Sequence, residues 1–250
     1  MGWLFVRYLK LTLAYDGSNY HGFQRQKNAV GIQQIVEKAL SNLFDEEIKV
    51  AASGRTDTGV HAHAQVISFA TSGTVPTDKI VQAMSSYLPE DIVVWKAEDV
   101  AADFNARYSA QAKRYVYRIL ITETTNPFER NYTWQLKKMP DLSLLQAAAD
   151  IIIGEHDFSA FRSAGSAPVK TIKNIYKAEW TRIGAQELRF TIEGDGFLYH
   201  MVRNLVGAMV RVGNGKITLE RFKEILASGD RRKAGTAAPP QGLYLDEVFY

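Results

Sequence analysis

The sequence predicts an α+β protein made of two halves, residues 1–105 and 106–250. Three observations lead to this: short segments of alternating apolar residues, longer segments with apolar residues at helical spacing, and the order of the two kinds. In the first half the order is strand, helix, strand, strand, helix, strand, which is the ferredoxin-like unit of an antiparallel sheet with helices on one face. We place the join near Phe104–Arg107.

The elements of the first half follow from apolar spacing and turn residues. The segment from Leu9 to Tyr15 alternates and leads into a turn at Asp16-Gly17-Ser18. The remaining expected elements are a helix over Gly31 to Phe44, strands over Ile48 to Ala52 and Gln65 to Phe69, a helix over Thr77 to Tyr87, and a strand over Asp91 to Val100. Thr77 is the expected N-cap of the second helix, and Pro89 is expected to end it.

The second half opens with a strong strand, Ala112 to Ile121, whose period places Tyr115, Tyr117 and Ile119 on one face. We see no internal repeat, although this half could be a circularly varied copy of the first. The later expected elements are a returning strand over Tyr132 to Leu136, a helix from Pro140-Asp141, a loop from Phe158 to Pro168, strands over Thr171 to Arg182 and Glu187 to Glu193, helices over Phe197 to Val212 and Leu219 to Leu226, and a closing strand.

Composition narrows the class of protein. The chain of 250 residues has no cysteine, which excludes disulfides, thiolate catalysis and cysteine-based zinc sites. The opening Met1–Arg7 is too short an apolar run for a signal peptide, and no apolar stretch approaches the length of a membrane span. We therefore expect a cytoplasmic protein.

The charge is unevenly distributed along the chain. Residues 1–105 carry 9 Lys and Arg against 12 Asp and Glu, whereas residues 106–250 carry 21 against 15. The stretches Arg107 to Arg118, Arg162 to Lys173 and Arg203 to Lys216 contain no acid. Basic stripes of this kind suit a polyanion such as nucleic acid, although a charge run is also typical of a solvated surface.

The stretch from Ser53 to Ala62 is the clearest candidate site. It places the carboxylate of Asp57 two residues after Arg55 and two before Gly59, on a loop between two expected strands. A nucleophilic carboxylate must be ionised and aimed, and an adjacent cation favours the ionised form. Asp-Thr-Gly alone is also common turn chemistry, because Asp and Thr bond to their own backbone and Gly adopts positive φ.

Two histidines follow Asp57 closely. His61 and His63 are two residues apart on an expected strand, so they share a face and could mimic a pair of metal ligands. No third ligand is evident in the sequence, so we do not expect a metal site. A small-molecule hydrolase that uses Asp57 with His61 as base is a competing hypothesis, but it has no use for the basic stripes.

The string Gly-Arg-Thr-Asp-Thr-Gly-Val-His-Ala, residues 54–62, resembles at every position the signature of the TruA family of tRNA pseudouridine synthases. Four further segments resemble motifs of the same family in the expected order. They are Tyr15 to Gln26, Phe104 to Tyr117, Phe197 to Gly207 and Pro239 to Leu245.

The resemblance implies roles for particular residues. Asp57 would be the nucleophile, attacking either C1′ of the ribose or C6 of the uracil, and Arg203 would pair with it. Tyr115 would pack on the uracil and accept or relay the C5 proton, while Arg55 would fill the gap left by a flipped base or grip a phosphate. The candidate RNA-binding residues are Tyr20, Arg25, Arg107, Arg114, Arg162 and Lys170.

The implied activity is the isomerisation of uridine to pseudouridine in the anticodon stem-loop of tRNA, at positions 38–40, without a cofactor or metal. The implied assembly is a homodimer, and the implied fold joins two ferredoxin-like (RRM-like) halves into one extended, mainly antiparallel sheet with a central basic cleft. The alternative is a non-catalytic tRNA-binding protein on the same fold, for which a lone carboxylate facing a polyanion would have no use.

Overall fold

The computed structural model describes residues 6–165 and 170–250. The chain divides into two compact units. The first consists of residues up to Gln111 together with Leu245–Tyr250, and the second of Ala112–Tyr244. Residues 1–5 of the apolar opening and residues 166–168 of the expected loop from Phe158 to Pro168 lie outside the described residues.

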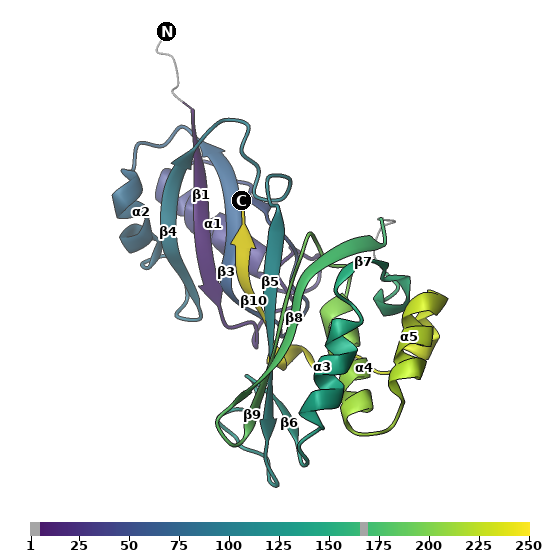
Figure 1. Ribbon diagram of the computed structural model, residues 1–250. Helices are drawn as coiled ribbons and strands as arrows, with labels where there is room; N and C mark the ends of the chain where they lie inside the picture. The colour runs from purple at the N-terminus through teal and green to yellow at the C-terminus, as the bar shows by residue number, and fades with distance from the viewer. Residues whose placement is uncertain (1–5, 166–169) are drawn as a thin grey trace. The chain divides into compact units, whose positions relative to one another are not determined.

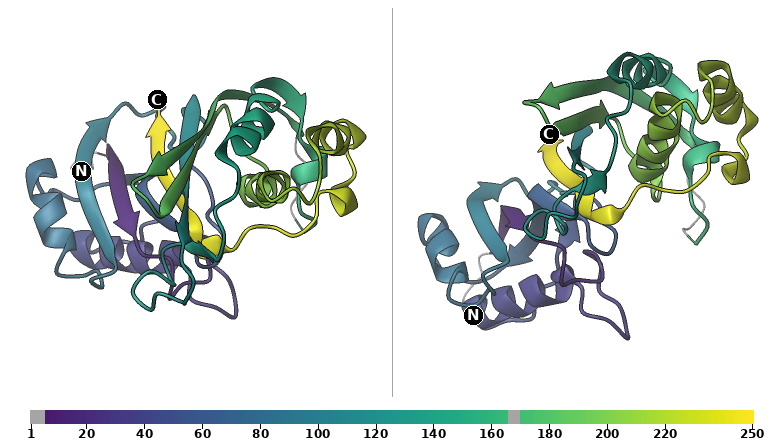
Figure 2. Two further views of the ribbon diagram at one scale, coloured as in Figure 1. Left: turned by 60° about the horizontal axis from the view of Figure 1, so that its bottom comes forward. Right: turned by 90° about the horizontal axis from the view of Figure 1, so that it is seen from below.

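The first unit contains a sheet whose strand order is β4-β1-β3-β10 (Figure 1). The short β2 also pairs with β3. Helices α1 and α2 lie on one face of this sheet (Figure 2). The elements are β1 Arg7–Tyr15, α1 Ile32–Phe44, β2 Ala51–Ala52, β3 His61–Thr71, α2 Thr77–Met84, β4 Ile92–Val100 and β10 Leu243–Phe249. The predicted order of strand, helix, strand, strand, helix, strand is confirmed.

The core of the first unit comes from two apolar periods. On β1, Leu9, Leu11 and Leu13 alternate with partly exposed residues and are fully buried. On α1, Ile32, Val36 and Leu40 recur every fourth residue and are also fully buried. Period two on a strand and spacing of four on a helix each form one apolar face, and burying such a side chain contributes about 1.5–3 kcal/mol.

The second unit contains an antiparallel sheet in the order β5-β9-β8-β7, with β6 added to β5 in parallel. Helices α3 and α4 pack against one another beside this sheet, and α5 lies on their far side (Figure 1). The elements are β5 Ala112–Ile121, β6 Trp134–Leu136, α3 Leu142–Asp150, β7 Gly154–Asp157, β8 Ile172–Ile183, β9 Glu187–Gly194, α4 Met201–Gly213 and α5 Leu219–Ser228, with single 3₁₀ turns at Ser159–Phe161, Arg231–Lys233 and Pro240–Gly242.

Strand β5 has the predicted bounds and the predicted buried face, since Tyr115, Tyr117 and Ile119 are all buried. Tyr117 is completely buried, and its hydroxyl donates to the carbonyl oxygen of Pro239 at 2.7 Å. Burial raises the pKa of this hydroxyl well above its ordinary value, and the positive charge of Arg203 opposes the shift only in part. The hydroxyl is therefore a neutral donor that fixes the C-terminal segment to β5.

Several local predictions were wrong because residues distant in the sequence form hydrogen bonds with groups that the local pattern assigns to a helix cap or a strand. Thr77 is not the N-cap of α2 but its first residue, after Pro76, and its hydroxyl bonds with Arg7 and Asp99. The strand expected over Ile48 to Ala52 shrinks to Ala51–Ala52. The backbone N–H groups of Ile48 and Val50 donate instead to side chains of α1, as described next.

The amide of Ile48 donates to the hydroxyl of Ser41, and that of Val50 to the carboxylate of Glu37. A strand needs these amides for its ladder, so their loss ends the pairing. Helix α4 begins at Met201 rather than at Phe197, because His200 adopts a left-handed conformation with φ of 61°. Strand β7 was not predicted, and β6 runs parallel rather than antiparallel to β5.

No helix within residues 6–165 and 170–250 combines the length and the apolar character needed to cross a membrane.

We expect Tyr117→Phe to lower the free energy of unfolding by about 0.5–1.5 kcal/mol, because the part-buried carbonyl of Pro239 would lose its donor. Urea or thermal unfolding of the two proteins measures this. Tyr87→Phe is the matched control, since the Tyr87 ring is 46% exposed and its hydroxyl is not needed by a buried group. Equal stability of Tyr117→Phe and the unchanged protein would contradict the anchoring role.

Candidate active site

Asp57 lies on the loop between β2 and β3 and begins a tight turn. The amide of Val60 donates to the carbonyl of Asp57 at 3.1 Å, and Gly59 has φ of +74°. A turn with positive φ at its third residue is the type II turn, for which Gly is the preferred residue. Asp57 itself is half-buried, whereas its neighbours Arg55 and Thr58 are exposed. The Asp-Thr-Gly segment therefore forms a tight turn and also leaves the Asp57 carboxylate partly exposed.

The N-terminal end of this loop is held by buried polar side chains of unit one. The hydroxyl of Ser53 donates to Gln65 Oε1 at 2.6 Å, and Gln65 Nε2 donates to the carbonyl of Gly54 at 3.0 Å. Ser53 and Gln65 are fully buried. Because each polar group has a partner, burial here costs little and makes the loop rigid.

A second loop, residues 16–23, packs directly on the Asp57 loop. The amide of Phe23 donates to the carbonyl of Thr56 at 3.1 Å, and the hydroxyls of Tyr15 and Thr56 are 2.8 Å apart. Gly22 has φ of +81°, and a Cβ there would lie 2.5 Å from the carbonyl oxygen of Thr56. Only glycine allows this approach, so Gly22 sets the position of the residue that precedes Asp57.

The other end of the turn is held in the same way. A Cβ on Gly17 would lie 2.0 Å from the carbonyl oxygen of Val60, and the amide of Gly17 donates to Nδ1 of His61 at 3.0 Å. His61 is 2% exposed, and Asp16 Oδ1 is 3.1 Å from the same nitrogen. His61 therefore joins the two loops.

His63 does not share this environment. Its side chain is half exposed and its Nδ1 lies 3.0 Å from Asp246. Within the described residues, 6–165 and 170–250, no group of three or more His, Asp or Glu side chains is arranged to hold a metal ion.

Two of the predicted RNA-binding residues of the first loop have partners inside the protein. Tyr20 is 7% exposed and its hydroxyl donates to the carboxylate of Asp91. Burial and Asp91 both raise the pKa of Tyr20. Arg25 is more exposed and pairs with the buried carboxylate of Glu37. Both residues support the loop, and their contact with RNA stays a prediction.

In the second unit, Tyr115 lies on β5 opposite Ile192 of β9 and packs edge-on against Phe197, with ring centroids 5.1 Å apart. Phe197 belongs to the turn that leads into α4. The ring of Tyr115 is thus held by the same segment that carries Arg203, six residues further along.

Arg203 is fixed to the extended segment 234–238, which runs beside α4. Its Nε donates to the carbonyl of Ala238 at 2.8 Å, and the amide of Ala238 donates to the carbonyl of Arg203 at 2.9 Å. Gly207, one turn later, permits the approach, because a Cβ there would lie 2.3 Å from the carbonyl oxygen of Thr236. The backbone thereby restricts the direction of the guanidinium.

The neighbouring Asn204 is 1% exposed and connects three segments. Its amide nitrogen donates to the carbonyl of Phe161 at 2.7 Å, and its oxygen accepts from Nη2 of Arg231 at 2.7 Å. Arg231 also donates to the carbonyl of Gly235 at 2.8 Å. Arg231, the first of three successive basic residues, therefore supports α4 and the segment 234–238.

The remaining basic candidates differ in their surroundings. Arg114 pairs with Glu193 at 2.9 Å, and the guanidinium of Arg107 lies 5.5 Å from the centre of the Tyr108 ring. Arg162 is half-buried after the turn Ser159–Phe161, and Lys170 is exposed. Asp57, Arg55, Tyr20, Arg25 and Arg107 belong to the first unit and the others to the second, so the pairing of Asp57 with Arg203 stays a prediction.

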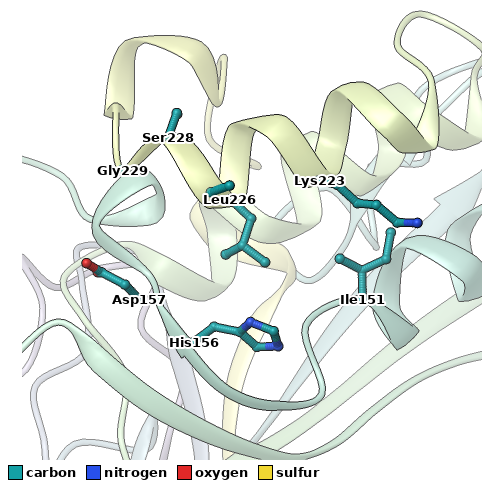
Figure 3. A pocket seen from close by; sticks show the side chains of 8 residues that line it. Ile151, His156, Asp157, Lys223, Leu226, Ser228 and Gly229 are labelled. Atoms are coloured by element: carbon teal, nitrogen blue, oxygen red, sulfur yellow. The ribbon is translucent and has the colours of Figure 1, made fainter.

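A cavity of about 430 Å³ lies in the second unit, between the C-terminal part of α5 and the segment around β7 (Figure 3). Ile151 and Leu226 give it apolar walls, and His156, Asp157 and Lys223 line it with polar groups. None of the predicted site residues lines this cavity.

We expect Gly22→Ala to destabilise the protein more than Gly154→Ala. Both glycines have positive φ, which costs alanine about 1–2 kcal/mol, but a Cβ at Gly154 would meet nothing within 4 Å, whereas at Gly22 it would strike Thr56. Thermal unfolding of the two variants measures the difference. Equal losses would show that the approach of the two loops can relax without cost.

The comparisons with known proteins concern almost the whole chain. The family described as tRNA pseudouridine synthase matches residues 12–109 and 148–250. A protein of Thermoanaerobacter sp. (strain X514) called tRNA pseudouridine synthase A is 44% identical over 98% of this chain and 100% of its own length. A protein of the same name from Acetivibrio thermocellus is 42% identical with the same coverage.

A solved structure, "Crystal Structure of a Cbf5-Nop10-Gar1 Complex", covers 94% of this chain and 57% of that chain at 11% identity. Its TM-score is 0.39.

The family match covers both the Asp57 loop and the segment of Tyr199 to Arg203, and the two relatives align from end to end. This chain belongs to the tRNA pseudouridine synthase family.

Proposed function

We propose that the protein isomerises uridine to pseudouridine in the anticodon stem-loop of tRNA, at positions 38–40, with Asp57 as the nucleophile. One observation carries the proposal. The nine-residue string around Asp57 lies within the family match, and two glycines that permit backbone contact, Gly17 and Gly22, hold it in place. An arrangement that fixes a carboxylate so closely suits a reaction in which that carboxylate must be aimed.

The reaction balances without any other reagent. The bond from C1′ to N1 breaks, the uracil turns while it is held, and a bond from C1′ to C5 forms. The proton on C5 is lost and N1 of the turned ring gains one, so no atoms or electrons are gained or lost. Asp57 attacks either C1′ or C6, and both routes regenerate the carboxylate.

The other residues have separate roles in this proposal. Tyr115 packs on the uracil and accepts or relays the C5 proton, and its contact with Phe197 supports a fixed ring. Arg203 pairs with Asp57, and the bond from its Nε to the carbonyl of Ala238 fixes the direction of the guanidinium. Arg55 is exposed beside the nucleophile and fills the space left by the flipped base.

The substrate must be turned out of an RNA helix, which costs a few kcal/mol and requires compensating contacts. We propose that Arg107, Arg114, Arg162 and Lys170 provide part of them through phosphates, with Tyr20 and Arg25 supporting the loop next to Asp57. We further propose a cytoplasmic homodimer that holds one tRNA across both subunits.

For the fold we propose two ferredoxin-like halves, 1–105 and 106–250, that share an extended sheet and a basic cleft. The strand order β4-β1-β3-β2 in the first unit supports the first half, since it is the order of a ferredoxin-like sheet. Use of Asp57 together with Tyr115 and Arg203 requires both halves in one reaction.

We expect Asp57→Ala to reduce pseudouridine formation by at least about 10³-fold, because no other group replaces a nucleophile. Binding of tRNA should change little, since phosphate contacts dominate affinity. Release of tritium from tRNA labelled at C5 of uridine measures pseudouridine formation. Filter binding at two salt concentrations measures the affinity for tRNA.

Asp78→Ala is the matched control, because Asp78 is an exposed carboxylate on α2 in the same unit. If Asp57→Ala keeps full activity, the nucleophile is wrong. If the unchanged protein binds tRNA but forms no pseudouridine, the non-catalytic binding protein is the better description.

We expect Arg203→Gln to reduce kcat by about 10²–10³-fold with little change in KM, as for other charged groups that act on the reacting centre. Steady-state kinetics with unmodified tRNA measures both constants. Arg221→Gln, on the exposed side of α5 where Arg221 pairs with Glu224, should behave like the unchanged protein. A change in KM alone for Arg203→Gln would make it a binding residue instead.

A further inference from the structure

Tyr199 is an exposed aromatic residue within the segment that carries Arg203. Its side chain is 42% exposed, whereas Leu198 before it and Met201 after His200 are buried. Two residues earlier, Phe197 packs on Tyr115. The turn from Phe197 to Met201 therefore directs its other apolar side chains inward and leaves the Tyr199 ring in solvent, at a free-energy cost that packing in the core would avoid.

The ring is held from behind. Its centroid is 3.8 Å from that of the His200 imidazole, with 31° between the planes, so one face of Tyr199 is stacked. His200 Nδ1 is 3.0 Å from the hydroxyl of Ser163, and the amide of Ser163 donates to the carbonyl of Tyr199 at 3.0 Å. These contacts fix the ring and still leave 42% of the side chain exposed.

The backbone at this point is strained. His200 has φ of 61°, and within residues 6–165 and 170–250 only Asp45 is another non-glycine residue with positive φ. Such conformations persist when surrounding contacts impose them, and they gather at ligand-binding sites. Here the imposed conformation turns the chain so that Tyr199 points outward just before α4 begins.

The surroundings suit an anionic ligand with flat groups. The two described segments that meet at Ser163 and Tyr199, residues 158–165 and 196–219, contain no Asp or Glu. Arg162 precedes Ser163, and Arg203 lies four residues after Tyr199. Proteins bind unpaired bases of RNA with aromatic faces next to basic residues, and the segments at Tyr199 supply both kinds of residue.

We propose that Tyr199 stacks on a nucleobase of the RNA other than the reacting uracil, at a position flanking the flipped nucleotide. This inference rests on the proposed function, in which the uracil itself packs on Tyr115. Stacking of this kind selects an unpaired base in the loop and holds the strand while the target is extruded.

The test compares Tyr199→Ala, Tyr199→Phe and the unchanged full-length protein on an unmodified tRNA transcript. We expect Tyr199→Ala to lower kcat/KM by about 5- to 150-fold, mainly through KM, as for loss of one base–aromatic stack. Tyr199→Phe keeps the ring and should match the unchanged protein. Tyr87→Ala removes a ring of similar exposure, 46% against 42%, and serves as control.

The base itself is identified with transcripts that carry one abasic nucleotide beside the target uridine. At one of these positions, removal of the base should lower kcat/KM of the unchanged protein as much as Tyr199→Ala does. Combining that abasic position with Tyr199→Ala should lower kcat/KM no further. The inference is overturned if Tyr199→Ala has full activity, if Tyr199→Phe is equally impaired, or if the losses add at every flanking position. If the unchanged protein forms no pseudouridine at all, the proposed function fails instead.

Discussion

The contact on which the candidate site depends is the approach of two backbones in the first unit. The loop 16–23 lies so close to residues 56–60 that a Cβ on Gly17 or Gly22 would overlap a carbonyl oxygen of the Asp57 loop. Hydrogen bonds from Phe23 and Gly17 then join the two loops at either end of the turn. Backbone contacts at both ends of the turn fix the position from which the Asp57 side chain projects, and so limit where its carboxylate can lie.

The second unit uses the same physical device for Arg203. Gly207 allows the segment 234–238 to lie against α4, and the two backbone partners at Ala238 fix the arginine's position along the helix. Asn204 and Arg231 fasten the same segment from the next residue. Both candidate reacting groups are therefore positioned by close backbone packing, which tolerates little change in side-chain volume.

The sequence predicted what repeats locally and missed what depends on distant partners. Strand β5 and the buried faces of β1, α1 and α4 follow from apolar spacing, and the Asp57 loop was placed correctly between two strands. The N-cap of α2 and the length of β2 were wrong, because Arg7, Asp99 and Glu37 take part in bonds that no local pattern contains. In the candidate site, a glycine in the sequence indicates a turn. Only the structure shows which backbone segment packs against Gly17 and Gly22.

For the charged residues too, the sequence gives their number, whereas only the structure gives their ion-pair partners. Several arginines counted in the basic second half have acidic partners within it, as Arg114 has Glu193 and Arg118 has Glu187. An ion pair removes one charge of each sign, so the excess of residues 106–250, 21 cations against 15 anions, is the same whether or not these pairs form. The long-range field that attracts a polyanion therefore persists, because it depends on that excess. A paired arginine, however, must share or give up its acidic partner to bind a phosphate. Specific phosphate contacts are therefore made preferentially by basic residues that lie far from any acidic side chain.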